Sequence, residues 1–275
     1  MPQFGLGTFQ QGSNEIAKNS VAVALKNGYR HFDTAHAYND ERGVGEGIKE
    51  SNIPREEIWI TSKLWYNDYT GADPDKAIDD MLKRLNVDYI DLLYIHQPVG
   101  DLKRAWKAME KAVKTGKARA LGISNFDFSE EAWKTIVDSM EIKPAVLQIE
   151  CHPYAQRIEM RKKAAAAGIQ VECWYPLGGA QSNGALFKDK MIMNIAKAHK
   201  KTPAQIILRW EIQEGLSIIP GATNPDYIKE NINIFDFSLS DSEMQAMRSL
   251  NKEDRFYKTN YEQLKKFVES WPVTD

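Results

Sequence analysis

The sequence predicts an α/β fold, namely a closed (β/α)8 TIM barrel with a C-terminal tail folded back over one face. Short apolar or β-branched runs alternate with longer amphipathic stretches eight times, the pattern of parallel strands joined by helices. The chain has 275 residues, a usual length for one barrel, and no linker rich in Gly, Ser or Pro divides it. Six units could form an open doubly wound sheet, but eight favour closure, and we expect a single domain over residues 1–275.

The strands are expected at short apolar runs that begin 24 to 32 residues apart, except for a last interval of 47. They are FGLGT (4–8), HFDTA (31–35), IWITSKL (58–64), IDLLYIH (90–96), ARALGIS (118–124), AVLQIEC (145–151), IQVECWY (169–175) and LSIIPGA (216–222). The long interval contains LGGAQSNGALFKD (177–189), which we expect to be a Gly-rich loop where the strands end. The tail from 251 to 275 has no strand pattern but is rich in aromatic residues, so we expect it to cover the barrel.

Helix signals lie between these runs. Asp73 is the expected N-cap of a helix from Pro74 to Leu85, because proline is favoured at the first helical position. Asn14 and Ser129 are expected to cap two further helices. The GVGEG segment at 43–47 lacks the GxGxxG spacing of a dinucleotide-binding turn, so its glycines are expected to allow close helix packing.

The composition excludes several classes of partner. Lys plus Arg is 36 and Asp plus Glu is 38, which gives a net charge of −2 and no basic stripe for nucleic acid. No apolar run approaches the ~20 residues of a membrane helix, and the first ten residues do not resemble a signal peptide. Cys151 and Cys173 are too few for a disulfide framework, so free thiols in the cytoplasm are expected. No exposed heptad pattern requires association, so we expect a monomer.

Polar residues gather where the expected strands end, which is the face that carries the chemistry of TIM barrels. Asp33 ends the second strand and Tyr38 follows it, while Lys63 and His96 end the third and fourth. Singly, each has an ordinary structural explanation: a helix cap, a surface aromatic, a rim charge and a core histidine. Four such accidents on one face are improbable, and a buried lysine needs an anion, for which Asp33 is the obvious candidate.

These four side chains suit proton delivery to a carbonyl. A phenol is a weak acid at neutral pH, and an ammonium within hydrogen-bond reach lowers its pKa. We therefore expect Lys63, held by Asp33, to tune Tyr38, and His96 to orient the carbonyl oxygen. No metal is expected, because the five histidines and two cysteines show no ligand spacing.

Several segments in order resemble the aldo-keto reductase family, including bacterial 2,5-diketo-gluconate reductases and prostaglandin F synthase-like members. They are GLGTFQ, GYRHFDTAHAYNDERGVGEGI, ITSKLW, YIDLLYIHQP, GKARALGISNF, LQIECHP, WYPLG and IIPGATNPDYIKEN, and they extend from Phe4 to about Leu250. The resemblance implies a barrel that binds a nicotinamide cofactor across the catalytic face. It implies Tyr38 as the general acid, Lys63 and Asp33 as the groups that tune it, and His96 as the group that positions the carbonyl.

The resemblance also implies contacts for the cofactor and the substrate. Ser124, Asn125 and Gln148 match residues that hold the nicotinamide carboxamide, and Trp174 matches an aromatic that stacks on the ring. Glu230 and Asn231 match adenine contacts near the start of the last barrel helix. The remaining expected cofactor contacts are Thr8, Phe9, Asp33, Tyr175, Leu177, Gly221, Ala222, Thr223 and Tyr227. The expected substrate contacts are Phe9, Tyr38, Trp65, His96 and Gln97.

The sequence departs from the family pattern in three ways. Many relatives carry a lysine and an arginine that clamp the 2′-phosphate of NADPH, and Gly221 and Tyr227 stand in their places. NADPH is the expected cofactor, and NADH becomes possible because these charge-assisted bonds are lost. Gln97 replaces a common tryptophan and makes the substrate side more polar. The usual hairpin before the first strand is not seen, so either the barrel bottom is less covered or the sequence starts late.

The expected function is NAD(P)H-dependent reduction of small aldehydes or ketones, including α-dicarbonyls and keto-sugars. A low-turnover, nicotinamide-binding regulatory subunit with the same fold is the alternative from another class. The presence of both Tyr38 and Lys63 disfavours it. A Schiff-base aldolase acting through Lys63 is a third possibility, which the carboxylate of Asp33 disfavours because a nucleophilic lysine must lose its proton.

Overall fold

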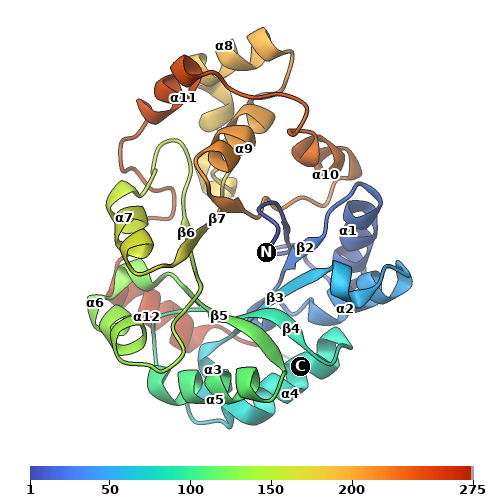
Figure 1. Ribbon diagram of the computed structural model, residues 1–275, viewed down its shortest axis with the longest axis vertical. Helices are drawn as coiled ribbons and strands as arrows, with labels where there is room; N and C mark the ends of the chain where they lie inside the picture. Colours follow the sequence, from blue (N-terminus) through green and yellow to red (C-terminus); the bar gives the residue numbers. More distant parts are fainter. Residues whose placement is uncertain (274–275) are drawn as a thin grey trace.

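A computed structural model describes residues 1–273 and confirms the predicted barrel. Eight parallel strands follow one another in sequence order, and helices surround them (Figure 1). The strands are β1 (Leu6–Gly7), β2 (His31–Asp33), β3 (Trp59–Leu64), β4 (Ile90–Ile95), β5 (Ala118–Ser124), β6 (Val146–Glu150), β7 (Gln170–Trp174) and β8 (Ser217–Ile218). Each lies within its predicted run, and most are shorter by one to five residues.

The sheet closes where β8 meets β1. Parallel bridges join Phe4 to Ile218 and Gly7 to Gly221 across this seam. The Gly5 amide donates to the Ile218 carbonyl at 2.9 Å, and the Gly7 amide donates to the Pro220 carbonyl at 3.3 Å. These two strands are much shorter than predicted. One reason is that Pro220 has no N–H to contribute to the ladder.

Most of the helices lie in the intervals between strands, and the last three follow β8. The helices are α1 (Asn14–Lys26), α2 (Glu41–Glu50), α3 (Tyr66–Tyr69), α4 (Pro74–Leu85), α5 (Leu102–Lys114), α6 (Glu130–Trp133), α7 (Ile158–Ala166), α8 (Lys190–His199), α9 (Pro203–Gln213), α10 (Pro225–Ile232), α11 (Asp241–Arg248) and α12 (Tyr261–Ser270). The long interval between β7 and β8 is explained by two helices, α8 and α9, which follow the predicted Gly-rich loop.

Two predicted caps are confirmed and one is wrong. Asp73 caps α4 by accepting from the Asp75 amide, and Ser129 caps α6 by accepting from the Ala132 amide. The cap of α1 is Ser13 and not Asn14, because the Ser13 hydroxyl accepts from the Ile16 amide. Asn14 is the first helical residue, and its side-chain oxygen accepts from the Gly43 amide at 2.8 Å.

The glycines of GVGEG lie within α2 and pack against neighbouring backbone, as predicted. A Cβ on Gly43 would lie 2.0 Å from the carbonyl oxygen of Asn14 in α1. A Cβ on Gly45 would lie 2.2 Å from the carbonyl oxygen of Leu85 in α4. No side chain fits in either place, so the two glycines set how closely α2 approaches its neighbours.

The C-terminal tail covers the face at which the strands end. Leu264 and Val268 of α12 pack with Trp65 in one apolar cluster. The Trp271 indole donates to the Ala37 carbonyl at 3.2 Å, and the Tyr261 hydroxyl donates to the Pro98 carbonyl at 3.3 Å. The tail therefore closes part of the mouth of the barrel, as the sequence predicts.

Candidate active site

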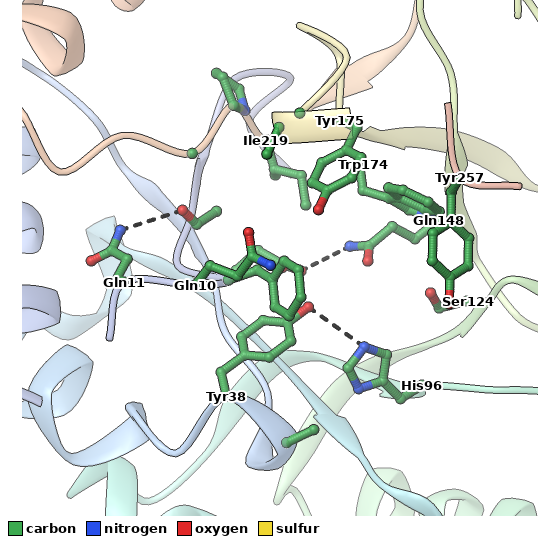
Figure 2. A pocket seen from close by; sticks show the side chains of 18 of the residues that line it. Gln10, Gln11, Tyr38, His96, Ser124, Gln148, Trp174, Tyr175, Ile219 and Tyr257 are labelled. Atoms are coloured by element: carbon green, nitrogen blue, oxygen red, sulfur yellow. Dashed lines mark hydrogen bonds between the residues drawn. The ribbon is translucent and has the colours of Figure 1, made fainter. Parts of the chain in front are cut away.

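A cavity of about 570 Å³ opens at the carboxyl ends of the strands, a volume typical of small-molecule sites. Tyr38 and His96 point toward each other across its floor, while Trp174 and Tyr175 lie on another wall (Figure 2). The walls come from the ends of β1 to β7 or the loops that follow them, from the chain around β8, and from the tail. Residues far apart in the sequence thus share one apolar chamber with a few polar groups.

The four predicted catalytic residues meet at the floor of this cavity. The Lys63 ammonium donates to Asp33 Oδ1 at 2.5 Å, to the Thr34 carbonyl at 2.9 Å and to Tyr38 Oη at 3.3 Å. Tyr38 Oη lies 3.5 Å from His96 Nε2. Lys63 is fully buried behind the tyrosine ring and does not line the cavity. The predicted pairing of lysine, carboxylate and phenol is therefore present.

Burial controls the proton affinities of this group. It raises the pKa of the Tyr38 phenol well above its usual value, and the Asp33 carboxylate raises it further. The predicted net lowering of the Tyr38 pKa is therefore wrong for the structure, because desolvation of the phenolate dominates. Burial also raises the pKa of Asp33, against the opposing effect of Lys63. Burial, followed by Lys63, lowers the pKa of His96 well below its usual value, so its ring is neutral.

The arrangement supplies one neutral phenol and one neutral imidazole to the same point in the cavity. A phenol that is kept protonated can donate to an oxygen that gains negative charge. The neighbouring ammonium then stabilises the phenolate that is left behind. The neutral imidazole can donate one hydrogen bond from Nε2 to the same oxygen. Such donors fixed in a dry site are stronger than in water.

The residues expected to contact a carboxamide are also brought together. The Trp174 indole donates to Asn125 Oδ1 at 3.0 Å, and Asn125 Nδ2 lies 3.2 Å from Ser124 Oγ and 3.1 Å from Gln97 Oε1. Gln148 Nε2 donates to Asp33 Oδ2 at 2.8 Å, which connects this group to the lysine pair.

Other predicted contacts divide into two sets. Those that line the cavity are Phe9, Asp33, Trp65, Gln97, Tyr175, Leu177, Gly221, Ala222 and Thr223. Those that do not are Thr8, Tyr227, Glu230 and Asn231. Thr8 is fully buried, whereas 60% of Tyr227 is exposed on α10. Glu230 and Asn231 lie near the carboxyl end of α10 and not near its start, and Glu230 accepts from Thr202 at 2.7 Å.

Several cavity residues were not predicted from the sequence. They are Gly7, Gln10, Gln11, Ala37, Pro176, Gly179, Ala180, Gln181, Ile219, Pro220, Tyr257, Phe267 and Trp271. The aromatic residues among them come from the tail. Their clustering in an otherwise polar segment was the available signal, but it did not say which of them faces the cavity.

A carboxylate at the end of β6 fixes the tail in place. Glu150 accepts from the amides of Phe256 at 2.7 Å and Tyr257 at 3.1 Å, and from Arg255 Nε at 2.9 Å. His152 Nε2 lies 3.3 Å from the same carboxylate. Burial acts to raise the pKa of Glu150, but His152, Arg255 and the Tyr257 amide outweigh it and lower the pKa to about 2. We call residues 254–258 with Glu150 the tail clamp, and it holds Tyr257 at the cavity wall.

The part of the chain that the structure describes has neither a metal-binding cluster nor a membrane-spanning helix. Within residues 1–273, no group of His, Cys, Asp and Glu side chains could hold a metal ion. Among the helices of the same residues, none has the length and apolar character needed to cross a membrane.

Comparison with known proteins agrees with this architecture. A sequence model of the Aldo/keto reductase family matches residues 3–252. The glyoxal reductase of Bacillus subtilis (strain 168) is 44% identical over 256 residues, which are 93% of this chain and 91% of that protein. Methylglyoxal reductase DkgA of Escherichia coli (strain K12) is 39% identical over 258 residues, covering 93% of this chain and 91% of that protein.

Solved structures show the same likeness. MGS-M4, an aldo-keto reductase enzyme from a Medee basin deep-sea metagenome library, superposes with a TM-score of 0.87. It is 37% identical, with 95% of this chain and 97% of that chain covered. An aldo/keto reductase from Brucella melitensis gives a TM-score of 0.84 at 39% identity, covering 91% of this chain and 95% of that chain. With a family match over most of its length and close relatives throughout, this chain belongs to the aldo/keto reductase family and is an oxidoreductase.

Proposed function

We propose that the protein reduces small aldehydes and ketones, α-dicarbonyls first among them, to alcohols with a nicotinamide cofactor. The observation that carries the proposal is the contact of Lys63 with both Asp33 and Tyr38 beside a neutral His96. The names of the relatives point to glyoxal and methylglyoxal as the first substrates to test. A cavity that is mainly apolar, with a few polar side chains such as Gln97, suits a compact carbonyl compound.

The cavity has features that fit a nicotinamide ring with its carboxamide. Trp174 and Tyr175 offer aromatic faces, and Ser124 and Gln148 offer polar atoms beside them. Gln148 Oε1 accepts no hydrogen bond from any residue in the described range 1–273. When bound there, the reduced cofactor supplies the hydride for the carbonyl carbon.

The residues of the chain then have separate roles. His96 orients the carbonyl oxygen by donating from Nε2, and Tyr38 gives its proton to that oxygen as negative charge develops. Lys63 stabilises the phenolate, and Asp33 holds the ammonium in place. Trp65, Phe267 and Trp271 exclude water from the reacting carbonyl. Because Lys63 does not line the cavity, a Schiff base on its nitrogen has no support.

The test uses Tyr38→Phe with methylglyoxal and either reduced cofactor. We expect kcat to fall about 10²- to 10⁴-fold, because general acid catalysis is lost. Cofactor affinity, followed by quenching of tryptophan fluorescence, should stay within about twofold. Tyr154→Phe is the matched control: it removes a phenol hydroxyl that donates to Asp189, and neither residue lines the cavity. Turnover by Tyr38→Phe at the wild-type rate would refute the role of the acid.

The same assay separates an enzyme from a regulatory subunit. A low-turnover subunit would bind cofactor and show no appreciable kcat on any member of a panel of small carbonyl compounds. An enzyme reduces at least one of them with kcat in the usual range of about 1 s⁻¹ or more.

Cofactor preference forms a second part of the proposal. Gly221, Ala222 and Thr223 line the cavity without a cationic side chain, and Tyr227 lies outside it. A 2′-phosphate there lacks the charge-assisted bonds of a lysine and arginine clamp. NADH is therefore expected to serve as a cofactor in addition to NADPH. A kcat/KM preference for NADPH above about 100-fold, about 2.8 kcal/mol, would rule this out.

A further inference from the structure

Glu172 on β7 lies inside the barrel, below the cavity, and has no established task there. Its side chain is 0% exposed, and strands on several sides supply its partners. Oε2 accepts from Tyr94 Oη at 3.0 Å and from Gln148 Nε2 at 2.7 Å. Oε1 accepts from Ser217 Oγ at 3.1 Å and lies 3.8 Å from His31 Nε2. A buried carboxyl group requires such partners, so their presence alone does not distinguish a structural role from a functional one.

Tyr94 reaches Glu172 only because the facing residue has no side chain. A Cβ added to Gly122 on β5 would lie 2.3 Å from Cε1 of the Tyr94 ring. Glycine at this point lets the ring lie across the barrel interior with its hydroxyl at the carboxyl group. The position of Oε2 is therefore fixed by packing as well as by hydrogen bonds.

The link to the cavity is Gln148. Its side-chain nitrogen carries two hydrogens, and both have acceptors: Asp33 Oδ2 at 2.8 Å and Glu172 Oε2 at 2.7 Å. The oxygen of the same amide accepts no hydrogen bond from the residues that the structure describes, and Gln148 lines the cavity (Figure 2). Two carboxyl groups below the amide thus hold the nitrogen inward and leave the oxygen for a ligand.

We propose that Glu172 is a positioning residue. Together with Asp33 it fixes the Gln148 amide so that the amide oxygen, Oε1, faces the cavity as a hydrogen-bond acceptor. The cavity then selects ligands that donate an N–H to this oxygen. The nicotinamide carboxamide carries such a donor. The inference deepens the proposed function and rests on it.

The orientation of the Gln148 amide does not require Glu172 to be charged. The charged or titratable groups around the Glu172 carboxyl are His31, Asp33, Lys63 and Tyr94, and Lys63 is the single cation among these four. Burial lowers the pKa of His31 to about 4, so its ring is neutral, and burial raises the pKa of Glu172. A proton on Oε1 can be donated to Ser217, and Oε2 then still accepts from Gln148. Glutamine at position 172 would keep an oxygen in that place, whereas leucine would not.

The experiment compares the binding of two oxidised dinucleotides, NAD⁺ and its 3-acetylpyridine analogue. The analogue keeps the carbonyl but has a methyl group instead of the amide nitrogen, so it cannot donate. Dissociation constants come from fluorescence titration without turnover. Wild-type protein is expected to bind the carboxamide about fivefold more tightly, the effect of one neutral hydrogen bond.

Variants at position 172 test whether Glu172 determines the ratio of the two dissociation constants. Glu172→Gln is expected to keep the wild-type ratio, and Glu172→Leu is expected to lower it at least about threefold, because the Gln148 amide loses one anchor. A purely structural role would lower the melting temperature and leave the ratio unchanged. Equal affinity of wild-type protein for the two ligands, or a wild-type ratio in Glu172→Leu, would overturn the inference.

If Glu172→Leu does not fold, the side-chain amide protons of Gln148 are followed in ¹⁵N-labelled wild-type protein, assigned by their absence in Gln148→Leu. Protection from exchange supports the inference, and exchange as fast as in exposed glutamines overturns it. If wild-type protein binds neither dinucleotide, the proposed function fails and the inference fails with it. Binding of both without discrimination removes the inference alone.

Discussion

The tail clamp makes the stability of the protein depend on the carboxylate of Glu150. The substitution Glu150→Gln measures how much free energy of unfolding this carboxylate contributes. The substitution keeps the size of the side chain but removes the charge that accepts from Phe256, Tyr257 and Arg255. The pKa of Glu150 falls from 4.5 to about 2 on folding. That difference corresponds to about 3 kcal/mol of stability at pH 7, an upper figure because glutamine keeps one acceptor oxygen.

The pH dependence follows from the same shift. A carboxyl with a lowered folded pKa stabilises the protein above its unfolded pKa of 4.5, and this stability is lost as the pH falls toward 2. The difference between wild type and Glu150→Gln should therefore shrink from about 3 kcal/mol at pH 7 to about 1 kcal/mol at pH 3.

Denaturant unfolding at several pH values, with hydrogen exchange at the amides of Phe256 and Tyr257, is the assay. Exchange should speed up in the variant, since both amides lose a charged acceptor. Glu253→Gln is the matched control, because Glu253 lies nearby and its side chain is 47% exposed. Its carboxylate accepts from Asn251 Nδ2 at 3.1 Å and forms a 3.6 Å ion pair with Arg157, both at the surface. This control should change stability by no more than about 0.5 kcal/mol. A Glu150→Gln protein as stable as wild type at pH 7, or a difference at pH 3 as large as at pH 7, would refute the reasoning.

Three further changes test other parts of the structure. Burial raises the pKa of Asp40 from 3.8 to about 6, against the hydrogen bond that its Oδ1 accepts from Thr34 Oγ1 at 2.6 Å. The charged carboxyl of Asp40 therefore destabilises the folded state at high pH. Asp40→Asn should raise the free energy of unfolding by about 3 kcal/mol at pH 8 but by less than about 1 kcal/mol at pH 4. Equal gains in stability at the two pH values would contradict this. Alanine has a higher helix propensity than glycine, but the Cβ of Gly45→Ala would meet the Leu85 carbonyl. We therefore expect Gly45→Ala to lower the free energy of unfolding by about 3 kcal/mol. An unchanged or raised melting temperature would count against this close packing. Asp73→Ala should lower the melting temperature by about 2–4 °C through loss of one cap, measured by circular dichroism, and no change would mean that the cap is not formed in solution.

The sequence predicted the floor of the site because strand ends are visible in it. Asp33, Lys63 and His96 each follow an apolar run, and parallel strands in a closed barrel bring such positions to one rim. Local pattern and topology are enough for that conclusion. The predicted direction of the Tyr38 pKa shift was wrong because the shift depends on the extent of burial, which no local sequence pattern gives.

The parts that were missed depend on contacts between distant segments. Ser13 and Asn14 are equally good caps in the sequence, and the choice between them follows from the bond of Asn14 to Gly43 on another helix. The tail was expected over the barrel, but the residue that fastens it, Glu150, lies over 100 positions earlier in the chain. The position of Glu230 and Asn231 was wrong because a resemblance in sequence did not give the length of α10.

The enclosure of Lys63 has a practical consequence for attaching the protein to a support. Its amine is sealed behind Tyr38, whereas lysines such as Lys76 and Lys83 extend 73% and 74% of their side chains into solvent. Amine-coupling reagents that act on the folded protein should therefore consume the outer lysines and spare this one. Immobilisation by that chemistry on beads or electrodes should leave the reducing centre intact.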